Sequence, residues 1–170
     1  MLHSIRRSGV RTFCAVLSLL FAGCYSFAGG GLPSHIKSVA VVPFDNETSA
    51  SMLQGELTNQ MRRDVENRLG LRAAAQNKAD AIVRGRIVRY EADIPVAYSA
   101  DPTTTTTSAE RKLQITVDIE IVDQSSGRTL WSQKGLTRDG TYAEGAEDSG
   151  RRQAIEKIVN DVVAGAQSQW

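Results

Sequence analysis

The sequence predicts an α+β domain in which two amphipathic helices pack on one face of a mixed, mainly antiparallel sheet of about four strands. Apolar and polar residues alternate strictly over residues 112–121, which is typical of a strand with one buried and one wet face. Apolar residues recur every fourth position over residues 53–69, which is typical of an amphipathic helix. A β-branched run over residues 36–44 precedes that helix, and a second helical stripe closes the chain. The order is therefore strand, helix, a meander of strands, and helix.

The first half of the domain contains one strand and one helix. Residues 36–44 are almost continuously apolar, as expected for a strand covered on both faces, and Pro43 ends the run. Ser51 and Gln54 have the spacing of a capping box, and Gly70 is placed to end the helix. The helix could lie on a membrane surface, but its polar face mixes acidic and basic residues. Packing against a sheet is the favoured interpretation.

The second half begins with a short edge strand at residues 71–74 and a longer strand at residues 81–91. Gly85 lies inside the longer strand, where a glycine marks a bulge or the close packing of a neighbouring element. Residues 101–107, rich in threonine, are predicted to form a loop.

The alternating strand turns at residues 123–127 into a hairpin partner at residues 128–134, which includes Trp131. The last helix is predicted from about Glu144 to the C-terminus. Its apolar stripe consists of Ile155, Ile158, Val159 and Val162.

The N-terminus has the pattern of a lipoprotein leader. Residues 1–23 carry basic residues, then an apolar run, then Ala22 and Gly23 before Cys24. We expect residues 1–23 to be a signal peptide and Cys24 to carry S-diacylglycerol and N-acyl lipid. Residues 24–34 then form a glycine-rich tether, and residues 35–170 form one domain. The alternative is an ordinary signal peptide with a cysteine at its boundary, and Phe21 departs from the leucine usual in a lipobox.

Composition narrows the function classes. Without residues 1–23 the chain has a formal net charge of −2, which argues against nucleic acid as the main partner. Cys14 lies in the predicted leader and Cys24 is predicted to be acylated, so we expect no disulfide. His35 is the only histidine outside the leader. We therefore expect no metal site, no cofactor beyond the covalent lipid, and no enzymatic activity.

Residues 24–33 (CYSFAGGGLP), 36–46 (IKSVAVVPFDN) and 79–87 (ADAIVRGRI), together with the predicted lipobox, resemble the LPS-assembly lipoprotein family LptE. The resemblance implies two helices on a four-stranded sheet. It also implies a lipid-anchored, periplasm-facing protein of the outer membrane that plugs the LptD-type β-barrel and assists the assembly of lipopolysaccharide. Tyr25 fits this location, because an aspartate directly after the acylated cysteine favours retention in the inner membrane.

Candidate contacts for lipopolysaccharide phosphates are Arg84 and Arg86, two apart on one predicted strand, and Arg111 and Lys112 at the start of the next. The competing interpretation is a solvated strand face whose arginines pair with Asp118 or Glu120.

Residues 39–44 (VAVVPF) also resemble the opening strand of lipoproteins related to CsgG and LpoB, which act as secretion-pore subunits or peptidoglycan-synthase activators. A pore subunit needs a long amphipathic strand pair, and residues 93–109 contain Pro95 and Pro102, which suit a barrel segment poorly. An envelope hydrolase would need a nucleophile and a base in a recognisable spacing, and the sequence shows no such pair.

Overall fold

The computed structural model describes residues 31–95 and 110–168. It contains a mixed sheet and two helices, which confirms the predicted α+β class. The sheet has six strands where about four were predicted. The elements are β1 (Ser38–Val41), β2 (Asp45–Asn46), α2 (Met52–Leu69), β3 (Arg72–Ala73), β4 (Ala81–Pro95), β5 (Glu110–Asp123), β6 (Thr129–Ala143) and α3 (Glu147–Ser168).

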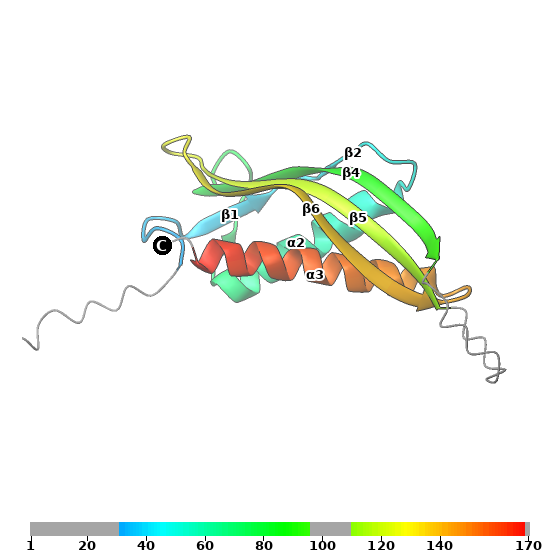
Figure 1. The fold of residues 1–170 in the computed structure, drawn as a ribbon. Helices are drawn as coiled ribbons and strands as arrows, with labels where there is room; N and C mark the ends of the chain where they lie inside the picture. The colour runs from blue at the N-terminus through cyan, green and yellow to red at the C-terminus, as the bar shows by residue number, and fades with distance from the viewer. Residues whose placement is uncertain (1–30, 96–109, 169–170) are drawn as a thin grey trace, which may run out of the picture.

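The sheet order is β3-β1-β4-β5-β6, and the short strand β2 also pairs with β4. Strands β1 and β3 run parallel to each other, as do β1 and β4, whereas β4, β5 and β6 form an antiparallel meander. Figure 1 shows both helices side by side beneath the sheet, with the opposite face of the sheet uncovered. The parallel pairing follows from α2, which returns the chain so that β4 starts at the same end as β1.

The first predicted strand is shorter than residues 36–44. Strand β1 ends at Val41, and a separate strand β2 begins at Asp45. Pro43 has no N–H to donate to a ladder, so pairing is interrupted there. The backbone N–H of Val42 still donates to Val83, and Phe44 turns into the core, where it is fully buried.

The predicted capping box of α2 is wrong. Ser51 has right-handed helical dihedral angles and its side chain makes no cap hydrogen bond. The preceding turn is held instead by Asn46, whose side-chain Nδ2 donates to the carbonyl of Ala50 and whose Oδ1 accepts from Thr48. The predicted end is confirmed, because Gly70 has φ +65° and donates its N–H to Glu66.

The alternation predicted for residues 112–121 is confirmed in β5, whose apolar positions are buried and whose polar positions are partly exposed. Strand β4 extends to Pro95, four residues beyond the prediction. A Cβ at Gly85 would lie 2.3 Å from the backbone oxygen of Asp118 and 2.8 Å from Phe44 Cε1. Close packing at Gly85 is thus confirmed, but the neighbours are the β5 backbone and the Phe44 ring, not a helix.

The turn at residues 123–127 and its hairpin are confirmed, but β6 continues to Ala143 past an irregular register between Gln133 and Leu136. Helix α3 begins at Glu147, three residues later than predicted, after a turn in which Ala146 N–H donates to Ala143. Its first turn crosses β6 closely, since a Cβ at Gly140 would lie 1.9 Å from the Gly150 oxygen.

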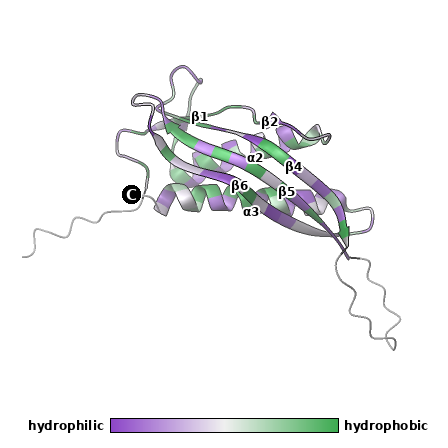
Figure 2. Cartoon of the chain, turned by 45° about the horizontal axis from the view of Figure 1, so that its top comes forward, coloured by the Kyte–Doolittle hydropathy of each residue, from purple (hydrophilic) through white to green (hydrophobic). Residues whose placement is uncertain are grey.

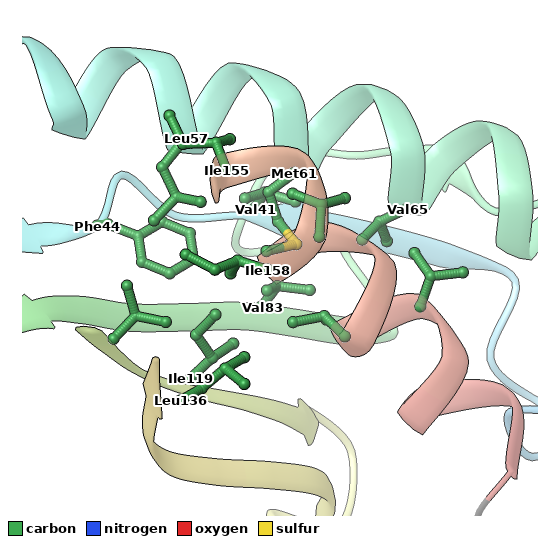
Figure 3. Packing of buried hydrophobic residues seen from close by; sticks show 14 of the residues in the cluster. Val41, Phe44, Leu57, Met61, Val65, Val83, Ile119, Leu136, Ile155 and Ile158 are labelled. Atoms are coloured by element: carbon green, nitrogen blue, oxygen red, sulfur yellow. The ribbon is translucent and has the colours of Figure 1, made fainter. Parts of the chain in front are cut away.

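The core lies between the helices and the sheet. Figure 3 shows Phe44, Leu57, Met61, Val83 and Ile158 directed into one interior from the sheet side, α2 and α3. All five are fully buried. The predicted stripe on α3 belongs to the same core: Ile155, Ile158, Val159 and Val162.

Candidate functional site

The uncovered face of the sheet carries the polar residues of β4 and β5. Arg84 and Arg86 project from β4, opposite Glu120 and Asp118 of β5 in the strand register. The flanking residues Val83 and Ile87 are fully buried on the helix side. Figure 2 shows the corresponding mixture of hydrophilic and hydrophobic positions along the strands. A side-chain period of two thus places both predicted arginines on the same exposed face.

Both arginines have carboxylate partners across the strand pair. Arg84 Nε lies 2.6 Å from Glu120 Oε1. Arg86 Nη2 lies 2.9 Å from Asp118 Oδ2, and its Nη1 lies 3.3 Å from Glu47 Oε1. The competing interpretation of the arginines as charge pairs is therefore confirmed for both.

The pairing shifts the pKa of its members in opposite directions. The pKa of Asp118 is lowered, first by the backbone N–H of Gly135, which donates to Oδ1 at 2.7 Å, and then by Arg86. The pKa of Arg86 is raised, mainly by its hydrogen bond to Asp118. Both charges are thus held in their ionised forms on the exposed face.

A shallow, open hollow of about 500 Å³ lies on this face, and the backbone of Gly85 forms part of its lining. Its charged and polar lining residues are Asp45, Arg84, Arg86, Asp118, Glu120, Ser132 and Lys134. Three basic and three acidic side chains therefore surround it. Such a hollow can exchange hydrogen bonds with a polar ligand without carrying a large net charge of its own.

Lys134 is the lining residue that the sequence reasoning missed. It is exposed on β6, and within residues 31–95 and 110–168 no carboxylate forms an ion pair with it. Its charge nevertheless lowers the pKa of Asp118. The hairpin turn at residues 123–127 predicts only that β6 runs back along β5, whereas the irregular register between Gln133 and Leu136 places Lys134 near Asp118.

Arg111 and Lys112 lie outside the hollow. Arg111 pairs with Asp93 at 3.1 Å and with Glu144 at 3.2 Å, near the far end of the β4–β5 pair. Lys112 Nζ lies 3.7 Å from Asp139. The structure brings Arg84 and Arg86 together but does not join Arg111 and Lys112 to them, and Cys24 lies outside the described residues.

A second charged cluster joins the two helices. The side chain of Arg151, only 8% exposed, lies 3.1 Å from Glu56 of α2 and 2.7 Å from Asp148 in its own helix. Tyr90 donates to Glu147 beside it, and burial raises the pKa of the Tyr90 hydroxyl. Every ionised group here has an opposite charge close by, and the Arg151–Glu56 pair adds a charged contact between α2 and α3 to their shared apolar core.

Among residues 31–95 and 110–168, no group of three or more metal-ligating side chains could hold an ion. No helix in this part of the chain is long and apolar enough to cross a membrane.

A helix-backed sheet with an uncovered, polar, hollowed face defines an α+β domain with one open sheet face. The chain belongs to the LptE lipopolysaccharide-assembly family, whose model matches residues 36–164. This confirms the resemblance noted in the sequence. The family consists of lipoproteins without enzymatic activity that take part in lipopolysaccharide assembly.

Solved structures share the fold at low sequence identity. PelC from Paraburkholderia phytofirmans, solved as a dodecamer, is 18% identical with a TM-score of 0.51, covering 82% of this chain and 94% of PelC. A DUF330-family protein from Xanthomonas campestris is 12% identical with a TM-score of 0.50, covering 81% of this chain and 89% of its own. Comparison with curated proteins finds no match.

Proposed function

We propose that this protein is an outer-membrane lipoprotein that assists the assembly of lipopolysaccharide at the cell surface as the partner of an LptD-type β-barrel. The family match over residues 36–164 carries the proposal. In this role the lipid on Cys24 holds the domain on the periplasmic face of the membrane. The sheet face that the helices leave uncovered is the surface available for the barrel or for lipopolysaccharide.

Within this role, we assign the hollow on the uncovered face to the phosphorylated part of the glycolipid. Arg84, Arg86 and Lys134 supply donors around it. The side chains of Arg84 and Arg86 are 60% and 53% exposed, and exposed ion pairs contribute only about 0–1 kcal/mol. A phosphate can therefore replace Glu120 or Asp118 as the partner of an arginine at little cost. Arg111 and Lys112 are not part of this assignment.

Co-purification tests the partnership. The acylated protein, isolated from detergent-solubilised outer membrane, is expected to bring an LptD-type barrel with it in stoichiometric amount. Its depletion is expected to lower surface lipopolysaccharide. Recovery with a peptidoglycan synthase or as a secretion pore would refute the proposal and favour the class related to CsgG and LpoB.

Charge reversal tests the hollow. Arg84→Glu with Arg86→Glu is expected to weaken retention of lipopolysaccharide by the purified protein. The matched control is Arg62→Glu with Arg63→Glu, an equal charge change on two exposed positions of α2. Both measurements are made at one ionic strength, because screening changes every surface charge. Equal losses for the two pairs would indicate general charge attraction, and no loss for either would remove the hollow from the proposal.

A further inference from the structure

The two ends of the sheet differ in charge. Strands β1, β3, β4 and β6 start at one end, where β5 finishes, and the described chain also begins there at Gly31. We call this the tether end and define it as residues 31–38, 66–80, 122–130 and 164–168. The opposite, distal end comprises residues 45–47, 89–95, 110–112 and 139–152. Figure 1 shows these two ends at opposite sides of the molecule.

Basic residues dominate the tether end. It carries five arginines and lysines against three carboxylates: Lys37, Arg68, Arg72, Lys78 and Arg128 against Glu66, Asp80 and Asp123. The distal end carries five basic residues against nine carboxylates. The formal charges are therefore +2 and −4, and the domain has a charge asymmetry along the strand direction that its nearly neutral total conceals.

The basic side chains of the tether end are exposed, whereas two of its three carboxylates accept hydrogen bonds from neighbouring residues. Asp80 accepts from the backbone N–H groups of Lys37 and Ser38, both at 2.9 Å. Asp123, whose side chain is 6% exposed, accepts from Ser125, Ser126 and His35. All five basic residues are exposed. Within residues 31–95 and 110–168, none of the five forms an ion pair.

The backbone holds these basic residues on one surface. Arg72 N–H donates to the carbonyl of Lys37, which places β3 beside the start of β1. Gln124 N–H donates to Asp80, so the β5–β6 turn lies against the segment that carries Lys78. Arg128 closes that turn by accepting from Asp123 N–H. The basic row therefore crosses the whole width of the sheet.

The predicted anchor, Cys24, precedes this end of the domain closely in sequence. Leu32 packs against the core, and Ile36 N–H donates to Pro33, so the chain is already folded from residue 32 onward. Six residues separate Cys24 from Gly31, and even a fully extended chain spans no more than about 25 Å from one to the other. The tether end is therefore the end of the domain nearest the bilayer when Cys24 is acylated.

We propose that the tether end is a membrane-contact surface on which Lys37, Arg72, Lys78 and Arg128 bind the headgroups of anionic phospholipids. Basic residues at a membrane surface are attracted to anionic lipid within about a Debye length, roughly 10 Å at 0.1 M salt. This attraction, together with the predicted anchor at the same end, sets which end of the domain faces the lipid headgroups.

The test is sedimentation of the mature chain with lipid vesicles. The chain starts at residue 24 and carries Cys24→Ser, so acylation makes no contribution, and the core residues 36–166 are retained. Vesicles of phosphatidylcholine alone are compared with vesicles in which roughly one-third of the lipid is phosphatidylglycerol. Binding is expected only to the anionic vesicles and is expected to disappear at an ionic strength of about 0.5 M.

Matched charge reversals locate the surface. Lys37→Glu with Arg72→Glu is expected to lower partitioning onto anionic vesicles by at least about tenfold. The control, Arg62→Glu with Arg63→Glu, makes the same charge change on α2 away from the basic row and is expected to leave most of the binding. Lys78→Glu with Arg128→Glu provides a second reversal in case the first pair fails to fold, which a thermal melt detects.

Equal losses of vesicle binding for the reversal and the control would overturn the proposal in favour of general charge attraction. Equal binding of the wild type to neutral and anionic vesicles would also overturn it. Absence of binding to any vesicle would also overturn it. The assay contains neither barrel nor lipopolysaccharide. Its failure would thus leave co-purification with the barrel, and with it the proposed function, unaffected.

Discussion

Replacement of Gly85 by alanine is expected to destabilise the domain severely, although it adds only one methyl group. The new Cβ would lie 2.3 Å from the backbone oxygen of Asp118, 2.8 Å from Phe44 Cε1 and 3.1 Å from Ile119 Cα. Two of these three neighbours are backbone atoms of the adjacent strand, and Phe44 is fully buried. None of them can move away without disturbing the β4–β5 ladder or the core.

Overpacking of a well-packed core costs about 1–3 kcal/mol. We expect the upper end of that range for Gly85→Ala, because relief of the closest contact requires a backbone shift. Gly55→Ala is the matched control. Gly55 lies inside α2 and is exposed, and a Cβ added there would meet no neighbouring element within 4 Å. Alanine there is expected to stabilise the protein by about 0.5–1 kcal/mol through helix propensity.

Urea unfolding of the two purified variants measures both effects. The midpoint is expected to fall for Gly85→Ala and to rise for Gly55→Ala, with an unchanged denaturant slope. A double variant with Phe44→Leu separates the ring from the backbone contact, because a smaller side chain relieves only the ring. A Gly85→Ala variant within about 0.5 kcal/mol of the wild-type free energy of unfolding would refute the close-packing argument.

Three further predictions concern the core, the pH response and the anchor. Val117→Asp is expected to unfold the domain, because Val117 is fully buried and an unpaired carboxylate there costs several kcal/mol. Thr116→Asp, on the uncovered face, is expected to be tolerated. Equally small losses of thermal stability for the two variants would show that the strand register is wrong. Hydrogen bonds from Ser126, Ser125 and His35 lower the pKa of Asp123, so its stabilisation is present above its unfolded-state pKa and is lost as the pH falls below about 4. Thermal melts between neutral and acidic pH are expected to show a smaller loss for Asp123→Asn than for the wild type, and an identical loss would exclude a contribution from Asp123. Cys24→Ala is expected to leave the domain folded but not anchored. Mass spectrometry of the mature wild-type N-terminus checks the acylation directly. An unmodified Cys24, or cleavage at another position, would disprove the predicted lipid anchor.

Periodicity predicted the parts of the fold in which one side-chain pattern persists over several turns or strand residues. The alternation in β5 and the four-residue spacing in α2 are such patterns, and both are confirmed. The errors fall where a local feature depends on distant residues. Strand β2 exists because Asp45 and Asn46 meet Arg86 and Ile87 of β4, which two polar residues alone do not indicate.

The capping box failed for a related reason. Ser51 and Gln54 have suitable spacing, but the Asn46 turn has already folded the backbone at Ser51 into the helical region. Gln54 donates to the carbonyl of Phe44 instead of capping the helix.

The candidate site was also predicted only in part. Alternation placed Arg84 and Arg86 on one face, and pairing of these arginines with Asp118 or Glu120 was one of two interpretations that the sequence allowed. Lys134 was missed because the irregular register of β6 brings it beside Asp118, and that irregularity has no clear sequence signal.

The parallel pairing of β1 with β4 also bears on how the chain folds. Residues 42–80 separate the two strands, whereas β4, β5 and β6 are neighbours in sequence as well as in space. Contacts between distant residues form more slowly than local ones, since a long loop must close first. In a chain that emerges N-terminus first, the apolar strand β1 therefore has only the two-residue strand β3 as a partner until β4 appears. During that interval the edge of β1 that later meets β4 is open to wrong pairing with other chains, so a chaperone that covers residues 36–44 would benefit this protein more than one that acts on the C-terminal meander.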